Sequence, residues 1–212
     1  MLEIIVEKTH DYAKMHNLAK MIQKQILRGT KLVNNVHTLS VLENEDTKLK
    51  PINIYSVLLE SINNIKKMYD NKKIEVKLES TCKKIMVNAD EHLKQVFENI
   101  LINSIKYNDK ELVKVQIKIS KYEKDSKNFI KMEFIDNGIG VRDDRKKEIF
   151  KRGNRELKGT KGMGIGLSLV KEILRIYNSN ISVEDRVQND YSKGSKFVIL
   201  MPHKNYLNTK EK

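Results

Sequence analysis

Residues 134–141 read Phe-Ile-Asp-Asn-Gly-Ile-Gly-Val, the end of a β-strand followed by an acid and two glycines separated by one residue. We expect Asp136 at the mouth of a sheet, where its carboxylate can accept a hydrogen bond from an exocyclic amine such as that of adenine. Gly138 and Gly140 would let the backbone approach a planar ligand closely. An ordinary turn is the alternative, because Asp, Asn and Gly also form turns.

A second segment with chemical character lies upstream, at residues 99–107, and reads Asn-Ile-Leu-Ile-Asn-Ser-Ile-Lys-Tyr. Asn99, Asn103 and Lys106 are spaced i, i+4 and i+7, which places them on one face of a helix. Two amides and an ammonium group on one face can hold a hydrated Mg²⁺ ion and nearby phosphate oxygens. A helix with an ordinary polar side facing solvent is the alternative.

The third segment, residues 159–167, reads Gly-Thr-Lys-Gly-Met-Gly-Ile-Gly-Leu and opens directly into a predicted helix. Backbone N–H groups and a helix N-terminus together form a cradle for an anion. The segment is not a Walker A loop, because no Gly-Lys-Ser/Thr ends it. It is not a dinucleotide fingerprint either, because no parallel βαβ strand precedes it.

In this order and spacing, the three segments resemble the N, G1 and G2 boxes of the histidine-kinase ATP-binding domain, within the GHKL superfamily of gyrase, Hsp90 and MutL. Residues 149–153, Ile-Phe-Lys-Arg-Gly, are similar to the F box, and residues 194–197, Gly-Ser-Lys-Phe, to the closing Gly-Thr-x-Phe strand. The resemblance covers about residues 50–202. Residues 36–43 resemble the end of the second helix of the dimerisation and phosphotransfer hairpin. The style of the motifs is closest to archaeal-type or related soluble sensor kinases.

The resemblance implies roles for individual residues. Asp136 would bind the adenine amine, Asn103 helped by Asn99 would hold Mg²⁺, and Lys106 and Tyr107 would contact phosphate and ribose or base. Residues 141–166 would form a mobile ATP lid in which Phe150 packs as an anchor and Arg152 or Lys161 reaches the γ-phosphate. The implied catalytic residues are Asn103, Lys106 and Arg152, and the implied metal ligands are Asn99 and Asn103. The implied nucleotide-binding residues are Asn99, Asn103, Lys106, Tyr107, Asp136, Gly138, Gly140, Lys161, Gly162, Gly164, Gly166, Leu167 and Ser195.

Apolar periodicity predicts the secondary structure. Helices are expected over 13–43, 54–68, 92–106 and 167–177, with a short one over 142–152. Strands are expected over 74–78, 84–87, 113–120, 129–135, 181–185 and 196–201. Helices mixed with antiparallel strands indicate an α+β sandwich with one sheet covered by helices on one face. The resemblance makes this the two-layer GHKL (Bergerat) ATP-binding fold.

The chain is expected to contain a helical region, residues 1–45, an ATP-binding catalytic domain, residues 50–204, and a polar tail, residues 205–212. Residues 44–51 carry no periodicity and are predicted as a linker. A 30-residue amphipathic helix needs partners for its apolar stripe, and a helical hairpin that dimerises into a four-helix bundle is the usual solution. Residues 2–7 would end the preceding helix, with residues 9–11 as the turn. A turn at Gly29-Thr30 is the alternative.

The family's phosphate-accepting histidine belongs early in the first hairpin helix. Between His10 and Glu43 there are 32 residues, so two arms and a turn would leave arms of roughly 14 residues, about 21 Å long. The family's arms are longer, so the acceptor is expected upstream of Met1 and the chain is expected to be a truncated piece. The alternatives are His10 or His16 as acceptor, or a kinase-like protein without one. His37, His92 and His203 lie elsewhere in the pattern.

Composition narrows the function classes. Lys and Arg total 41 against 28 Asp and Glu, a formal charge of +13, but the positive residues are spread out and the chain has no Trp. A nucleic-acid surface is therefore not favoured. Cys82 is the sole cysteine, so no intrachain disulfide or cysteine-rich metal site is expected, and a reducing, cytoplasmic setting is the default. No segment approaches the roughly 18 apolar residues of a membrane span.

The expected function is that of a homodimeric histidine protein kinase of a two-component system. It would bind ATP and Mg²⁺ and transfer the γ-phosphate to a histidine, and the receiver domain of a response regulator would then take the phosphate on an Asp. One alternative is an ATP-binding interaction module without catalysis. Another is an anti-sigma-type Ser/Thr kinase of the same superfamily, against which the helical region counts. A nucleic-acid binder is the third.

Overall fold

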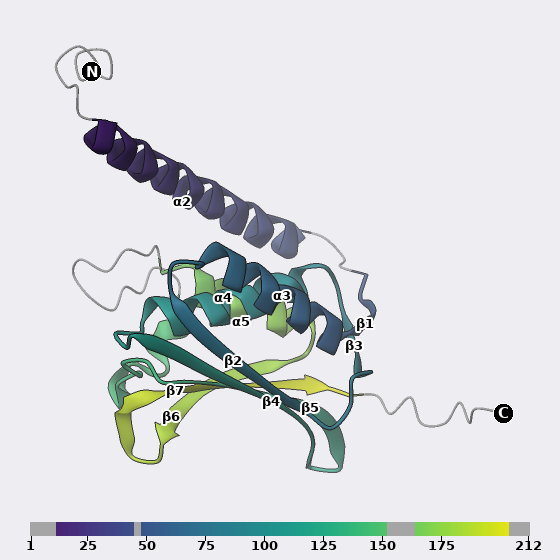
Figure 1. Cartoon of the computed structure of the whole chain (residues 1–212). Helices are drawn as coiled ribbons and strands as arrows, with labels where there is room; N and C mark the ends of the chain where they lie inside the picture. Colours follow the sequence, from purple (N-terminus) through teal and green to yellow (C-terminus); the bar gives the residue numbers. More distant parts are fainter. Residues whose placement is uncertain (1–11, 45–47, 152–163, 204–212) are drawn as a thin grey trace. The chain divides into compact units, whose positions relative to one another are not determined.

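The computed structural model describes residues 12–44, 48–151 and 164–203. The chain divides into two compact units, Met1–Glu43 and Asn44–Lys212, and Figure 1 shows the elements of each. The helix expected over residues 2–7 and the turn at 9–11 lie outside the described residues. Among the residues that are described, none of the helices is both long and apolar enough to cross a membrane.

The first unit contains helix α2, Tyr12–Asn44, which runs without interruption for 33 residues. The alternative turn at Gly29-Thr30 is therefore wrong. The hydroxyl of Thr30 donates to the carbonyl oxygen of Ile26, one helical turn back, at 3.1 Å. The side chains of Ile26 and Val33 are 62% and 65% exposed, so the described part of the chain leaves these two members of the apolar stripe of α2 uncovered.

The second unit is built on a five-stranded sheet with the order β2-β4-β5-β7-β6. The strands are β2 Lys73–Ser80, β4 Leu112–Lys124, β5 Lys127–Asp136, β6 Asn180–Val187 and β7 Asp190–Pro202. The predicted hairpin of β4 and β5 is confirmed, and its turn uses positive φ angles at Asp125 and Ser126.

One pairing differs from the expectation of antiparallel strands, because β2 runs parallel to β4, with Ile74 opposite Val113. A parallel pair needs a long crossover connection. Residues 81–111, which contain helix α4, His92–Lys106, supply that connection.

A separate two-stranded ribbon joins β1, Lys50–Asn53, to β3, Met86–Ala89, in antiparallel register. The predicted linker over 44–51 is therefore too long at its C-terminal end, because Lys50 and Pro51 already belong to a strand. Pro51 lies opposite Asn88, and proline is tolerated here because β1 is an edge strand of the ribbon. Strand β3 also begins two residues later than the predicted strand over 84–87.

Three helices cover one face of the sheet: α3 Ile54–Met68, α4, and α5 Gly166–Ile176 (Figure 1). The predicted bounds of α3 and α4 are confirmed. The Asn53 side chain organises the entry to α3, because its Oδ1 accepts from the backbone N–H groups of Tyr55 at 3.3 Å and Ile85 at 3.1 Å. Alternate side chains of the sheet and the inner faces of the helices form the core, and Phe97 of α4 meets Phe134 of β5 with ring centroids 5.9 Å apart. The predicted two-layer α+β sandwich is thus confirmed.

The short helix expected over residues 142–152 is replaced by two 3₁₀ turns, η1 Asp143–Arg145 and η2 Glu148–Phe150. Tertiary contacts at each turn account for the break. Lys146 pairs with Asp185 of β6 at 2.7 Å, and the buried ring of Phe150 packs edge-on against Phe197 with centroids 6.4 Å apart.

Candidate functional site

The Asp136 carboxylate ends β5 and is almost fully buried. Its Oδ1 accepts from the backbone N–H groups of Gly138 at 2.9 Å and Ser195 at 3.2 Å. Its Oδ2 accepts from the hydroxyls of Ser195 at 2.6 Å and Ser104 at 3.4 Å. Burial raises the pKa of Asp136, and these four hydrogen bonds, which favour the ionised form, oppose that rise.

Close backbone approaches surround this carboxylate. A Cβ atom at Gly138 would lie 2.4 Å from the carbonyl oxygen of Tyr107, the residue that ends α4. Gly140 has a φ of +69°, and a Cβ there would lie 1.7 Å from the carbonyl oxygen of Tyr191. Gly194, at a φ of +119°, brings β7 against the carbonyl of Asp136 in the same way. The glycines therefore let backbone pack closely against backbone, and the approach to a planar ligand that the sequence predicts for Gly138 and Gly140 stays a prediction.

Helix α4 presents the two predicted amides differently. Asn103 is half-buried, and its backbone carbonyl oxygen accepts from the Tyr107 backbone N–H at 3.0 Å. Asn99 is buried, and within the described residues its Nδ2 is a buried donor without a hydrogen-bond partner. An unpaired buried donor is costly, so Asn99 is suited to a hydrogen-bond acceptor that arrives with a ligand.

Lys106 and Tyr107 form a contact of their own at the end of α4. The ammonium group of Lys106 lies 2.9 Å from the Tyr107 hydroxyl and 4.4 Å from the centroid of the same ring. Both side chains are only partly exposed. In this arrangement the positive charge is held over an aromatic face, one helical turn from Asn103.

The start of α5 meets α4 at Gly166, where a Cβ atom would lie 3.1 Å from Oδ1 of Asn99. Gly164 has a φ of +66°, and Leu167 is the second residue of α5. Three of the predicted residues, Arg152, Lys161 and Gly162, lie outside the described residues. Among the rest, α4 contacts both the loop after β5 and the start of α5.

The sequence reasoning missed three residues with specific contacts here. Ser104 reads as a core position within the segment 99–107, and only its contact with Asp136 marks it. Gly194 lies in the quoted closing motif, but its positive φ is not visible in sequence. Asn137 joins strand ends, because its Oδ1 accepts from the Lys114 backbone N–H at 2.8 Å and its Nδ2 donates to the Leu112 carbonyl at 3.0 Å.

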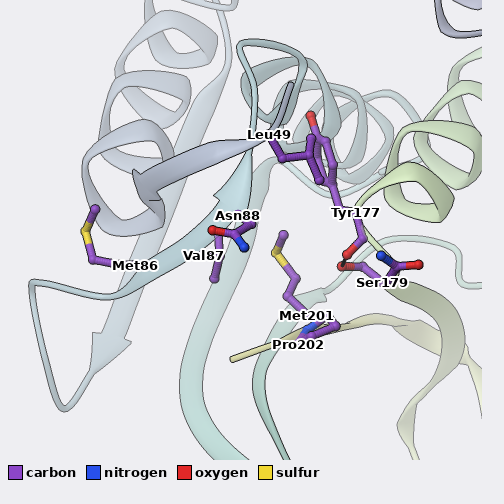
Figure 2. Close-up of a pocket in the computed structure, with 9 residues that line it drawn as sticks. Leu49, Met86, Val87, Asn88, Tyr177, Ser179, Met201 and Pro202 are labelled. Carbon is purple, nitrogen blue, oxygen red and sulfur yellow. Dashed lines mark hydrogen bonds between the residues drawn. The ribbon is translucent and has the colours of Figure 1, made fainter. Parts of the chain in front are cut away.

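A cavity of about 190 Å³ lies elsewhere in this unit, lined by residues that include Leu49, Asn88, Tyr177 and Met201. Figure 2 shows Val87 and Asn88 of β3 on one side of it and Met201 of β7 on the other, with the Tyr177 ring at the rim. Met201 follows Ser195 by six residues in β7, which is about 20 Å along a strand. None of the predicted site residues that the structure describes lines this cavity, so it is not part of the candidate site.

Potential metal ligands of the usual kind do not gather here. Over residues 12–44, 48–151 and 164–203, there is no group of three or more His, Cys, Asp or Glu side chains that could hold a metal ion. Any metal at this site would therefore rely on amide oxygens, water and the ligand's own oxygens.

Comparison with known proteins gives the family. The Histidine kinase-, DNA gyrase B-, and HSP90-like ATPase family matches residues 88–205. The chain is 28% identical to the uncharacterized sensor-like histidine kinase ycf26 of Porphyra purpurea over 84% of its length, and 31% identical to the sensor protein RprX of Bacteroides fragilis over 62%. It spans only 29% and 25% of the lengths of these two relatives. They give no support to an archaeal likeness.

Solved structures show the same fold. Full-length ShkA in complex with AMPPNP matches 93% of this chain, and 40% of that chain, with a TM-score of 0.71 at 22% identity. The histidine kinase AdeS of Acinetobacter baumannii matches 96% of this chain and 92% of its own, with a TM-score of 0.67 at 21% identity. The catalytic domain of the histidine kinase ThkA, at 21% identity, matches 74% of this chain and 97% of its own with a TM-score of 0.62. The chain therefore belongs to the histidine kinase-, DNA gyrase B- and HSP90-like ATPase family, and within it resembles the catalytic core of sensor histidine kinases.

Proposed function

We propose that this chain is the catalytic part of a two-component histidine kinase, which binds ATP with Mg²⁺ in its second unit and transfers the γ-phosphate to a histidine. The observation that carries the proposal is the buried Asp136 carboxylate, held by four hydrogen bonds beside α4 and flanked by backbone that only glycine permits. A fixed acceptor suits the exocyclic amine at the edge of adenine.

The other predicted residues take roles that agree with their surroundings. Asn103 offers an amide oxygen, a hard ligand of the kind that Mg²⁺ accepts together with water and phosphate oxygens. The Nδ2 of Asn99, which has no partner in the part of the chain that the structure describes, would donate to a phosphate oxygen or to another acceptor that enters with the nucleotide. Lys106 would turn from the Tyr107 ring to a phosphate. Gly164, Gly166 and Leu167 would supply backbone at the start of α5, and Arg152, Lys161 and Gly162 belong to the same proposal.

The proposed reaction moves one phosphoryl group twice. The bond between the γ-phosphorus and the β,γ-bridging oxygen of ATP breaks, ADP leaves, and an imidazole nitrogen takes the phosphoryl group. A carboxylate of a response-regulator receiver domain then takes the same group from the histidine. Bound Mg²⁺ would neutralise charge on the phosphate oxygens, while the groups of the chain hold the nucleotide in place.

The exposed apolar stripe of α2 supports the proposed dimer. Ile26, Val33 and Val36 are each more than half exposed. A helix of this length is stabilised when such a stripe is buried against others. A second copy of residues 1–45, within a helical bundle, is the partner we propose for it.

ATP binding tests the nucleotide site directly. Asp136→Asn keeps the shape of the side chain but turns part of the acceptor into a donor, so ATP affinity should fall by about two orders of magnitude. Asp125→Asn, in the exposed β4–β5 turn where Asn tolerates a positive φ, is the matched control. Equal ATP affinity of the Asp136→Asn variant and the wild type would refute the nucleotide site.

Phosphoryl transfer is tested with γ-labelled ATP and an intact helical hairpin as substrate. Label that is acid-labile and alkali-stable supports phosphohistidine. Acid-stable label on a partner protein would instead indicate a Ser/Thr kinase. ATP binding without any transferred label would indicate an interaction module.

A further inference from the structure

The two oxygens of the Asp136 carboxylate have different neighbours. Both neighbours of Oδ1 are backbone N–H groups, of Gly138 and Ser195, which can only donate. Both neighbours of Oδ2 are hydroxyls, of Ser195 and Ser104, which can donate or accept. Oδ1 is therefore always an acceptor, and a proton on this carboxyl group would reside on Oδ2. The state of Oδ2 decides whether the group can accept from a ligand or donate to one.

Ser104 is the side chain through which α4 reaches Oδ2. Its hydroxyl has one hydrogen and two acceptors at similar distances, the Ile100 carbonyl at 3.3 Å and Oδ2 at 3.4 Å. An ionised carboxylate is a stronger acceptor than a neutral carbonyl. The Ser104 hydroxyl therefore donates its hydrogen to Oδ2 when the carboxylate is ionised. This contact stabilises the ionised form of Asp136, which can only accept hydrogen bonds.

We propose that Ser104 is a positioning residue that sets base specificity, because its hydroxyl keeps Oδ2 of Asp136 an acceptor and so selects 6-aminopurine over 6-oxopurine nucleotides. This inference rests on the proposed nucleotide site. A 6-amino group donates a hydrogen bond to Oδ2. A 6-oxo group is itself an acceptor, so its oxygen would lie opposite Oδ2 with no hydrogen between them. Without the Ser104 hydroxyl, the protonated carboxyl group, which can donate to a 6-oxo group, becomes relatively more favourable.

The test compares the affinities of ATP and ITP, each with Mg²⁺, by calorimetry on the full chain. In Ser104→Ala the ratio of the ITP and ATP dissociation constants should fall about tenfold, the lower end of what is expected for one hydrogen bond to a charged group. Because both nucleotides are measured on the same variant, a general loss of folded protein cancels in the ratio.

Ser61→Ala is the matched control. Ser61 is equally buried in α3, and its hydroxyl donates to the Val57 carbonyl four residues earlier at 2.9 Å, as Ser104 can to Ile100. The control should leave the ratio at the wild-type value. A wild-type preference for ATP that is the same in Ser104→Ala and Ser61→Ala would overturn the role of Ser104 but not the nucleotide site. A wild type that binds both nucleotides equally would also overturn it, and one that binds neither would refute the proposed function itself.

Discussion

Tyr177, at the end of α5, donates its hydroxyl hydrogen to Oδ1 of Asp90, at the start of α4, and this bond is buried. The same carboxylate oxygen accepts from the His92 backbone N–H at 2.9 Å, which organises the first turn of α4. The bond therefore joins the two helices at the ends remote from Asn103 and Gly166. Burial, and then the Asp90 contact, raise the pKa of Tyr177, so the phenol stays a donor at neutral pH.

Tyr177→Phe should lower the free energy of unfolding by about 1–3 kcal/mol, because the buried Asp90 carboxylate loses a donor while the ring remains in place. Urea unfolding at pH 7 measures the change. Tyr191→Phe, at a partly exposed tyrosine of β7, is the control and should change the free energy by less than about 0.5 kcal/mol. Equal stabilities of wild type and Tyr177→Phe would show that the Asp90 carboxylate does not depend on this donor.

The raised pKa of Asp136 predicts a particular pH dependence. The folded chain binds the proton of the Asp136 carboxyl group more tightly than the unfolded chain, in which the pKa of this group is near 3.8. The contribution of Asp136 to stability is therefore largest at low pH. It declines as the pH rises from 3.8 through the folded-state pKa, by about 1.4 kcal/mol for each tenfold difference in proton affinity. The free energy of unfolding of the wild type, measured relative to Asp136→Asn between pH 4 and 7, should fall with pH. A relative rise with pH would contradict burial as the dominant influence.

The contact between Gly138 and Tyr107 predicts that a single methyl group will disturb the site. In Gly138→Ala the new Cβ meets the Tyr107 carbonyl oxygen at 2.4 Å, so backbone must shift, at a cost of about 1–3 kcal/mol in stability, and ATP affinity should fall with it. Thermal unfolding and ATP titration are the measurements. Gly29→Ala is the counterpart, because nothing lies within 4 Å of its new Cβ in α2, and it should leave ATP affinity unchanged. A fully stable, ATP-binding Gly138→Ala variant would refute the close approach.

The exposed apolar stripe of α2 predicts that charged side chains placed on it will weaken the proposed dimer. Ile26→Lys and Val33→Lys place charge on the stripe, and together they should raise the dimer dissociation constant at least tenfold, because each charge would have to be desolvated in the bundle. Asn34→Lys, an exposed polar position of the same helix, adds the same charge as a control and should leave the dimer intact. Sedimentation equilibrium distinguishes the two results. A double variant as dimeric as the control would place the interface elsewhere.

The periodic segments were predictable because their signals are local. The bounds 54–68 and 92–106 follow from apolar spacing alone, and β4 and β5 follow from alternation. The conformation of the segment 142–152 was not predictable, because contacts with Asp185 and Phe197, far along the chain, decide it. Strand β1 was missed for a similar reason. Lys50 and Pro51 carry no strand pattern, and only their pairing with β3 makes them a strand.

By itself, the sequence determined most of the long helices and the strands of the five-stranded sheet, and it predicts that Asn103, Asp136 and the glycines after it belong to one site. These properties depend on side chains close together in the chain. Only the tertiary structure decided that β2 runs parallel to β4, that Asn99 has a buried donor without a partner among the described residues, and that Ser104 reaches Asp136. The physical reason is that register, burial and hydrogen-bond partners arise between residues distant in sequence, such as Ser104 and Ser195, which meet only at the Asp136 carboxylate.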